Sequence, residues 1–147
     1  MTNSTTSNDQ ETETLKIYPD TTLQTSLSRQ AKEFRSAYKI ANSNSRPARA
    51  RQHNLIVEEF KEFLEAESTL YLSSNDHKES ALKELADLVY VCYQYAENMG
   101  WDLDEAMYRV HESNMSKLDD EGNPIYREDG KVLKGPNYKP PNLQDLV

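Results

Sequence analysis

Apolar side chains recur every three or four residues in four successive segments, and this periodicity limits the fold more than any other feature. The first such segment spans residues 26–41, and its apolar members are Leu27, Ala31, Phe34, Tyr38 and Ala41. This spacing places apolar groups on one face of an α-helix. Comparable patterns predict helices over residues 46–70, 76–99 and 103–118. A chain of 147 residues with this pattern is expected to be all-α, with four helices.

Short signals at the ends of these segments support the predicted helices. Side chains that can cap a helix N-terminus, together with one glycine suited to a helix C-terminus, lie at the expected boundaries. These signals are Ser45 with Pro47, Asp76 with Glu79, Gly100, and Asp102 with Glu105.

The two ends of the chain differ from its helical middle. Residues 1–24 are polar and are predicted to form a disordered extension, which leaves residues 25–147 as the folded domain. From about residue 123, Asp129 and Gly130 lie between two short strand-like runs, a pattern typical of a β-hairpin. Three prolines then predict an extended arm up to Val147.

The composition excludes several classes of protein. The single cysteine, Cys92, excludes a disulfide framework and a cysteine-rich zinc site. No apolar run approaches the ~18 residues of a membrane span, so we expect a soluble protein of the reducing cytoplasm. Residues 25–51 hold seven basic residues and one acidic residue, whereas residues 52–122 hold 5 basic and 17 acidic residues. The acidic block argues against stable nucleic-acid binding and is compatible with a cation site.

Several carboxylates are predicted to face the core. A helix turns by about 100° per residue, so the direction of each side chain can be calculated. In the second predicted helix, Glu59 falls within the apolar arc and Glu62 at its edge, whereas Glu58 falls outside it. In the third, Glu84 falls within the apolar arc and Asp87 at its edge. Two helices therefore offer the same arrangement of two carboxylates each.

Carboxylates in an apolar face need protonation, a basic partner or a metal ion, because an unpaired buried charge is costly. Four oxygen ligands without a cysteine suit Mg²⁺ or Mn²⁺. A di-iron bundle would need Glu-x-x-His motifs. The residues three positions before His53, His77 and His111 are not glutamate. We therefore favour Mg²⁺, with Mn²⁺ as its substitute.

Asn114 and Lys117 lie on the apolar stripe of the fourth predicted helix. A lysine there either reaches past the end of the core or meets an anion near the carboxylates, and a phosphate ligand fits the second alternative. The basic segment of residues 25–51 is either a solvated helix face or a further phosphate contact. We include Arg51 from this segment among the candidate substrate-binding residues.

The spacing of these carboxylates resembles the signature of the all-α nucleoside triphosphate pyrophosphohydrolases, which include MazG and phosphoribosyl-ATP pyrophosphohydrolase. Glu58-Glu59-x-x-Glu62 is followed, after 21 residues, by Glu84-x-x-Asp87. The segments of residues 111–118 and 124–141 are similar to a compact MazG-like branch found in bacteria, plants and tailed phages. The resemblance covers residues 25–143.

The resemblance implies a four-helix MazG-like bundle that a partner chain completes in a dimer or tetramer. It implies the host cytoplasm as the location if the gene is carried by a phage. It implies Glu59, Glu62, Glu84 and Asp87 as Mg²⁺ ligands, and Asn114 and Lys117 as triphosphate contacts. Glu59 and Glu62 are equal candidates for orienting the attacking water.

The activity implied is hydrolysis of a nucleoside triphosphate, with dGTP as one candidate, to the monophosphate and pyrophosphate. Two alternatives stay open at this point. One is hydrolysis of phosphoribosyl-ATP in histidine synthesis, and the other is a non-enzymatic acidic helical module that binds a basic partner.

Overall fold

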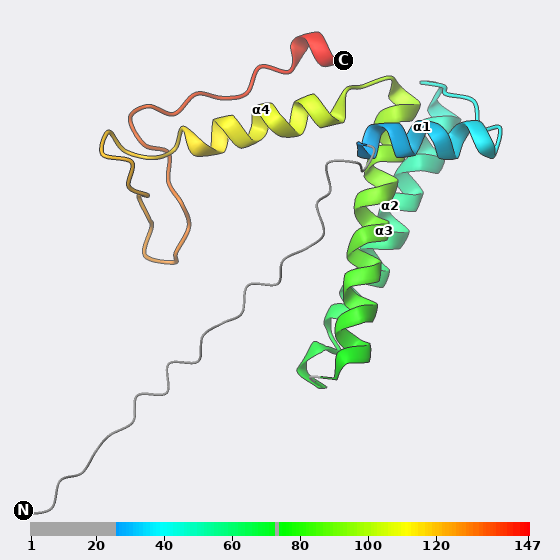
Figure 1. Cartoon of the computed structure of the whole chain (residues 1–147), viewed down its shortest axis with the longest axis horizontal. Helices are drawn as coiled ribbons and strands as arrows, with labels where there is room; N and C mark the ends of the chain where they lie inside the picture. Colours follow the sequence, from blue (N-terminus) through cyan, green and yellow to red (C-terminus); the bar gives the residue numbers. More distant parts are fainter. Residues whose placement is uncertain (1–25, 73) are drawn as a thin grey trace, which may run out of the picture.

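The computed structural model describes residues 26–72 and 74–147, and this part of the chain is mostly helical (Figure 1). The predicted disordered extension of residues 1–24 lies outside the described residues. Among the described helices, none is both long and apolar enough to cross a membrane. The helices are α1 (Leu27–Ala37), α2 (Arg46–Glu67), η1 (Leu70–Leu72), α3 (Asn75–Met99), α4 (Leu103–Met115) and η2 (Gln144–Leu146).

The centre of the fold is a helical hairpin made of α2 and α3, which lie side by side along most of their length (Figure 1). The predicted start of α2 is confirmed, because the Ser45 hydroxyl accepts a hydrogen bond from the Ala48 amide. The prediction that Asp76 caps α3 is wrong. Ser74 caps this helix by accepting from the amide of His77, and Asp76 lies inside the first turn. Serine and aspartate are both good caps, and the chain uses the earlier one.

The turn between α3 and α4 follows the sequence signals. Gly100 ends α3 with φ 73°, a left-handed conformation that glycine adopts at little cost. Asp102 begins α4 by accepting from the Glu105 amide at 3.0 Å. This short connection redirects the chain, so that α4 projects away from the α2–α3 hairpin (Figure 1).

Helix α1 crosses one end of the hairpin and is joined to it by a buried polar network. Arg35 of α1 donates to the side chain of Asn98 in α3 at 2.9 Å and to that of Asn42 at 2.6 Å. The Asn98 amide group also donates to the Ser43 carbonyl at 2.7 Å and accepts from the Ser43 amide. Asn98 therefore ties α1, the α1–α2 connection and α3 to one another.

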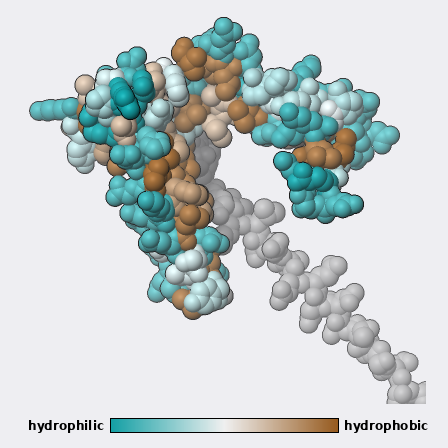
Figure 2. Space-filling model, turned by 180° about the vertical axis from the view of Figure 1, so that it is seen from behind, coloured by the Kyte–Doolittle hydropathy of each residue, from teal (hydrophilic) through white to brown (hydrophobic). Residues whose placement is uncertain are grey.

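The apolar core of the described chain is thin. Its buried members are mainly small side chains, namely Ala31, Ala48, Ala81, Val91, Tyr93 and Ala96. Several large apolar side chains are instead exposed to solvent, including Phe60 at 48% exposure and Leu82 at 67%. Apolar surface is visible along the hairpin in the space-filling view (Figure 2). A single chain thus leaves much of its amphipathic helix surface without a partner.

The all-α prediction is confirmed, but the four helices do not close into one bundle within a single chain. Helix α4 stands apart from the hairpin and keeps Met107, Tyr108 and Met115 exposed. The physical reason is that the C-terminal arm, rather than the hairpin, is bonded along α4. Its closing turn η2 contacts α4, and the Leu146 carbonyl accepts from the Asp102 amide at 3.3 Å.

The predicted C-terminal β-hairpin is not present as regular strands in the described residues. An isolated antiparallel bridge joins Tyr126 to Val132. A turn with Gly130 at φ 82° lies between these two residues. The Asp-Gly turn is therefore where the sequence predicts it, but the flanking runs are too short to extend the ladder.

Candidate metal centre

The α2–α3 hairpin brings three carboxylates together from two helices. Glu59 of α2 meets Glu84 and Asp87 of α3, and one oxygen from each lies within 4.8 Å of the others. All three residues are half-buried. Glu84 and Asp87 share a helical stripe with buried Val91, Gln94 and Asn98, at spacings of three and four. The packing of the two helices therefore positions the carboxylates.

The electrostatic environment opposes the charge on Glu59. Burial raises the pKa of Glu59, and the negative charges of Glu62, Asp87 and Glu84 raise it further, in that order. Glu58 adds a smaller contribution in the same direction. A cation at this position would relieve both the desolvation and the repulsion.

Lys83 is a site residue that the sequence analysis missed. Its ammonium lies 2.8 Å from Asp87 and 3.1 Å from Glu84. Hydrogen bonds to Asp87 and then to Glu84 raise the lysine pKa above its ordinary value. The spacing of four between Lys83 and Asp87 is a helix ion-pair signal that the sequence already contains. This lysine is therefore a counter-ion for two of the three carboxylates.

Glu62 is not part of the group of three convergent carboxylates. It is exposed and lies about one helical turn after Glu59. Together with Glu84, Thr69 and His77 it lines an open hollow beside the cluster. Its charge is near enough to contribute to the raised pKa of Glu59.

The candidate substrate-binding residues lie elsewhere in the chain. Asn114 is in the last turn of α4, and Lys117 follows that helix. This end of α4 lies away from the α2–α3 hairpin (Figure 1). Arg51 is exposed on α2, eight residues before Glu59. A single chain therefore does not bring Asn114 and Lys117 to its own carboxylates.

The donor set of the cluster fits a hard divalent cation. Three carboxylate oxygens from two rigid helices, half-buried and without a sulfur ligand, match the preferences of Mg²⁺ and Mn²⁺. These three residues would hold the cation from one side and leave it accessible to a ligand oxygen.

The fold and this cluster together define an all-α protein with a candidate divalent-cation site on a helical hairpin. More particularly, the chain belongs to the phosphoribosyl-ATP pyrophosphohydrolase family, whose sequence model matches residues 21–114. Membership supports a nucleotide pyrophosphohydrolase type of activity. The match contains all the predicted metal ligands and ends at Asn114, before Lys117 and the C-terminal arm. No curated protein matches the chain.

Proposed function

We propose that the chain is a Mg²⁺-dependent pyrophosphohydrolase that converts a nucleoside triphosphate into the monophosphate and pyrophosphate. The observation that carries this proposal is the convergence of Glu59, Glu84 and Asp87 in a member of this family. These residues would hold the cation, which Mn²⁺ could replace. We assign Glu62 as a fourth ligand because its charge reaches Glu59 and it shares a hollow with Glu84.

In the proposed reaction, a water oxygen bonds to the α-phosphorus, and the bond from that phosphorus to the α–β bridging oxygen breaks. The bridging oxygen leaves with pyrophosphate. A bound cation supplies charge neutralisation at the phosphate oxygens. Glu59 and Glu62 are the candidates for accepting the proton of the water.

The phosphate chain would be bound by Asn114 and Lys117, with Arg51 as a further contact. Since the end of α4 lies away from the carboxylates of its own chain, we propose that a second copy supplies these residues. The exposed apolar faces of α3 and α4 support such an assembly. The proposed state is therefore a homo-oligomer, either a dimer or a dimer of dimers.

The proposed substrates are deoxynucleoside triphosphates, and dGTP is the first to test because the chain resembles a phage-type branch. Phosphoribosyl-ATP is the second candidate, since the matching family is described by that activity. Both substrates present the same pyrophosphate leaving group to the carboxylates. The set of substrates tested therefore has to contain both dGTP and phosphoribosyl-ATP.

The test is pyrophosphate release from this set of substrates with Mg²⁺, with Mn²⁺ and with excess chelator. We expect turnover with either metal and none with chelator. Glu59→Gln should lower kcat by roughly a hundred-fold or more, as expected for a lost base and ligand. Glu58→Gln, a matched change outside the cluster, should retain most of the activity. Full turnover in chelator would contradict the metal dependence, and equal losses in the two variants would contradict the assignment of Glu59.

A further inference from the structure

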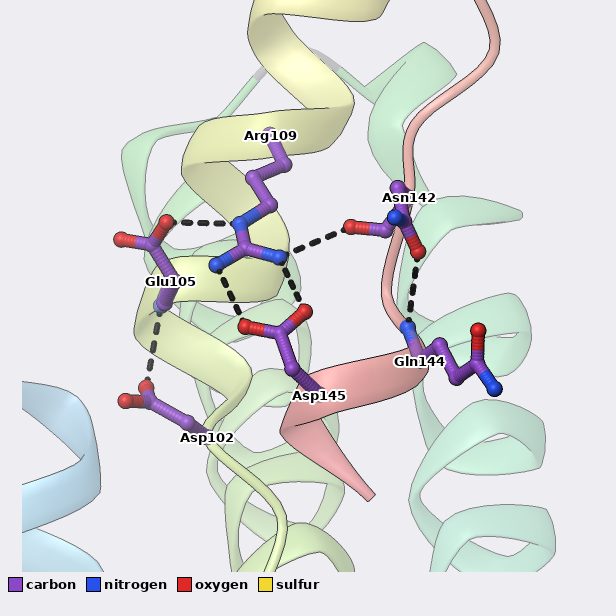
Figure 3. Close-up of polar contacts among 6 residues, drawn as sticks. All are labelled: Asp102, Glu105, Arg109, Asn142, Gln144 and Asp145. Carbon is purple, nitrogen blue, oxygen red and sulfur yellow. Dashed lines mark hydrogen bonds and ion pairs between the residues drawn. The ribbon is translucent and has the colours of Figure 1, made fainter.

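The C-terminal arm, residues 135–147, runs back along α4 and is bonded to it at several points (Figure 1). At the middle of α4, the Arg109 guanidinium holds the arm in a bidentate ion pair (Figure 3). Its two Nη atoms lie 2.6 and 2.9 Å from the Asp145 carboxylate oxygens. Arg109 also donates to the Asn142 carbonyl, and Glu105 accepts from its Nε at 2.7 Å.

The arm is bonded again at the C-terminal end of α4. The Ser113 hydroxyl donates to the Lys139 carbonyl at 2.7 Å, and the Lys139 amide donates to the Ser116 hydroxyl oxygen at 2.9 Å. The Gly135 amide donates to the Lys117 carbonyl at 2.9 Å. These contacts join the arm to two serine side chains at the C-terminal end of α4 and to the backbone just after that helix.

The arm lies in close backbone contact with the residues that follow α4. A methyl group on Gly135 would lie 2.5 Å from the Lys117 carbonyl oxygen and 2.7 Å from that of Leu118. Both obstacles are backbone atoms, so a side chain at position 135 would force the arm away from this segment. Glycine is needed here for close approach.

We propose that the arm is a positioning element for phosphate binding, a role that rests on the proposed function above. Its contacts at Ser113, Ser116 and the Lys117 carbonyl bracket Asn114 and Lys117, the two proposed phosphate contacts. The arm holds this turn in one conformation before the phosphate chain binds. The Asn114 amide and the Lys117 ammonium are then already in place, so binding does not have to order the backbone that carries them. Gly135 and Asp145 act through this turn and do not touch the substrate.

Two substitutions in the full-length chain loosen the arm at its two ends. Gly135→Ala introduces the steric conflict at Lys117, and Asp145→Asn weakens the exposed ion pair with Arg109. Gly122→Asn is the matched control, because a side chain there meets no atom within 4 Å and asparagine tolerates its φ of 81°. Trypsin cleavage after Lys134 reports release of the arm.

The decisive measurement is calorimetric binding of inorganic tripolyphosphate in the presence of Mn²⁺, compared with binding of Mn²⁺ alone. We expect both arm variants to be cleaved faster and to bind tripolyphosphate roughly ten-fold more weakly. Their Mn²⁺ affinity should stay within about two-fold of the parent, since the carboxylates lie on the hairpin. With a hydrolysed nucleotide, KM should rise and kcat should change little.

Three results would overturn the inference. They are unchanged tripolyphosphate binding in a variant whose arm is released, equal weakening of Mn²⁺ and tripolyphosphate, and unchanged cleavage in both variants. A parent protein that binds no tripolyphosphate would overturn it as well. A parent that binds tripolyphosphate but hydrolyses no nucleotide would instead contradict the proposed function. The role of the arm would then still be tested by the tripolyphosphate affinities of the two variants.

Discussion

At the scale of single residues, Glu59 lies where burial and four neighbouring carboxylates oppose its negative charge. The raised pKa means that the folded chain binds this proton more tightly than the unfolded chain does. As the pH rises above the usual range of a glutamate, the folded state therefore loses stability relative to a neutral side chain. A cation bound at this position would offset this cost.

We predict that Glu59→Gln stabilises the metal-free protein at neutral pH. Melting in chelator at about pH 7 should show a Tm higher by roughly 1–4 °C, the size expected for a change below about 1 kcal/mol. The gain should shrink as the pH falls through the ordinary pKa of a glutamate, because below it the parent carboxyl becomes protonated in both states. Glu58→Gln should change the Tm less. A gain that grows towards acid pH would contradict this account.

Lys83 competes with a metal ion for the same carboxylates, because its ammonium already pairs with Asp87 and Glu84. Removing it should therefore tighten the binding of Mn²⁺. We expect Lys83→Ala to lower the Kd roughly two- to five-fold at low ionic strength, and less in salt because the pair is exposed.

The control for Lys83 is Lys78→Ala, which removes the same charge from an exposed position nearer the start of α3. Calorimetric titration with Mn²⁺ measures both variants. Equal tightening in the two would indicate a general charge effect, and weaker binding in Lys83→Ala would contradict the competition.

At the scale of the elements, the end of α3 is held to α1 and to the α1–α2 connection by buried polar groups. Asn98 is only 3% exposed and serves both Arg35 and Ser43. The Arg35 Nη1 atom is buried without a partner among the described residues. Burial of this guanidinium lowers its pKa, and the charge of Glu97 only partly opposes that effect. The charge of Arg35 is therefore stabilised mainly by the hydrogen bonds that it does make, including the one to Asn98.

We predict that Asn98→Ala lowers the free energy of unfolding by about 2–3 kcal/mol. The change leaves Arg35 and both Ser43 backbone groups short of partners in a buried place. Urea denaturation followed by circular dichroism measures the loss. Asn44→Ala, an exposed change in the same connection, should stay within about 0.5 kcal/mol of the parent. A similar loss in both variants would contradict the role of the network.

At the scale of the whole molecule, apolar surface lies open on several helices. Leu82, Leu85 and Val89 of α3 line an apolar hollow with Leu27 of α1. Among the described residues, no large side chain is below 2% exposure. Contiguous apolar surface of this kind is typical of association between chains.

We predict that the chain is a dimer or tetramer at micromolar concentration. Leu82→Glu should shift the mass measured by light scattering towards the monomer, because a charge would be buried in the interface. In an isolated chain the same change would be harmless, since Leu82 is 67% exposed. Lys78→Glu is the matched control on the same helix and should keep the parent mass. An active monomeric parent would contradict the assembly.

The local features of this protein follow from its sequence. Periodicity predicts all four α-helices, and Ser45, Gly100 and Asp102 mark their ends, because helix formation and capping depend on residues a few positions apart. The helical phase likewise predicts that Glu59 points inward and that Glu58 does not. The predicted cap at Asp76 was wrong, because Ser74 is an equally good capping residue two positions earlier.

The tertiary structure decides what these local features do together. The register between α2 and α3 selects Glu59, Glu84 and Asp87 as the convergent carboxylates and leaves Glu62 beside them. The C-terminal arm is bonded along α4, which stands apart from the hairpin, and the segment around the Asp-Gly turn forms an isolated bridge instead of full strands. The periodicity of the sequence indicates only which face of each helix is apolar. Which surface covers that face depends on contacts between residues far apart in the chain, and those are set only when the helices pack.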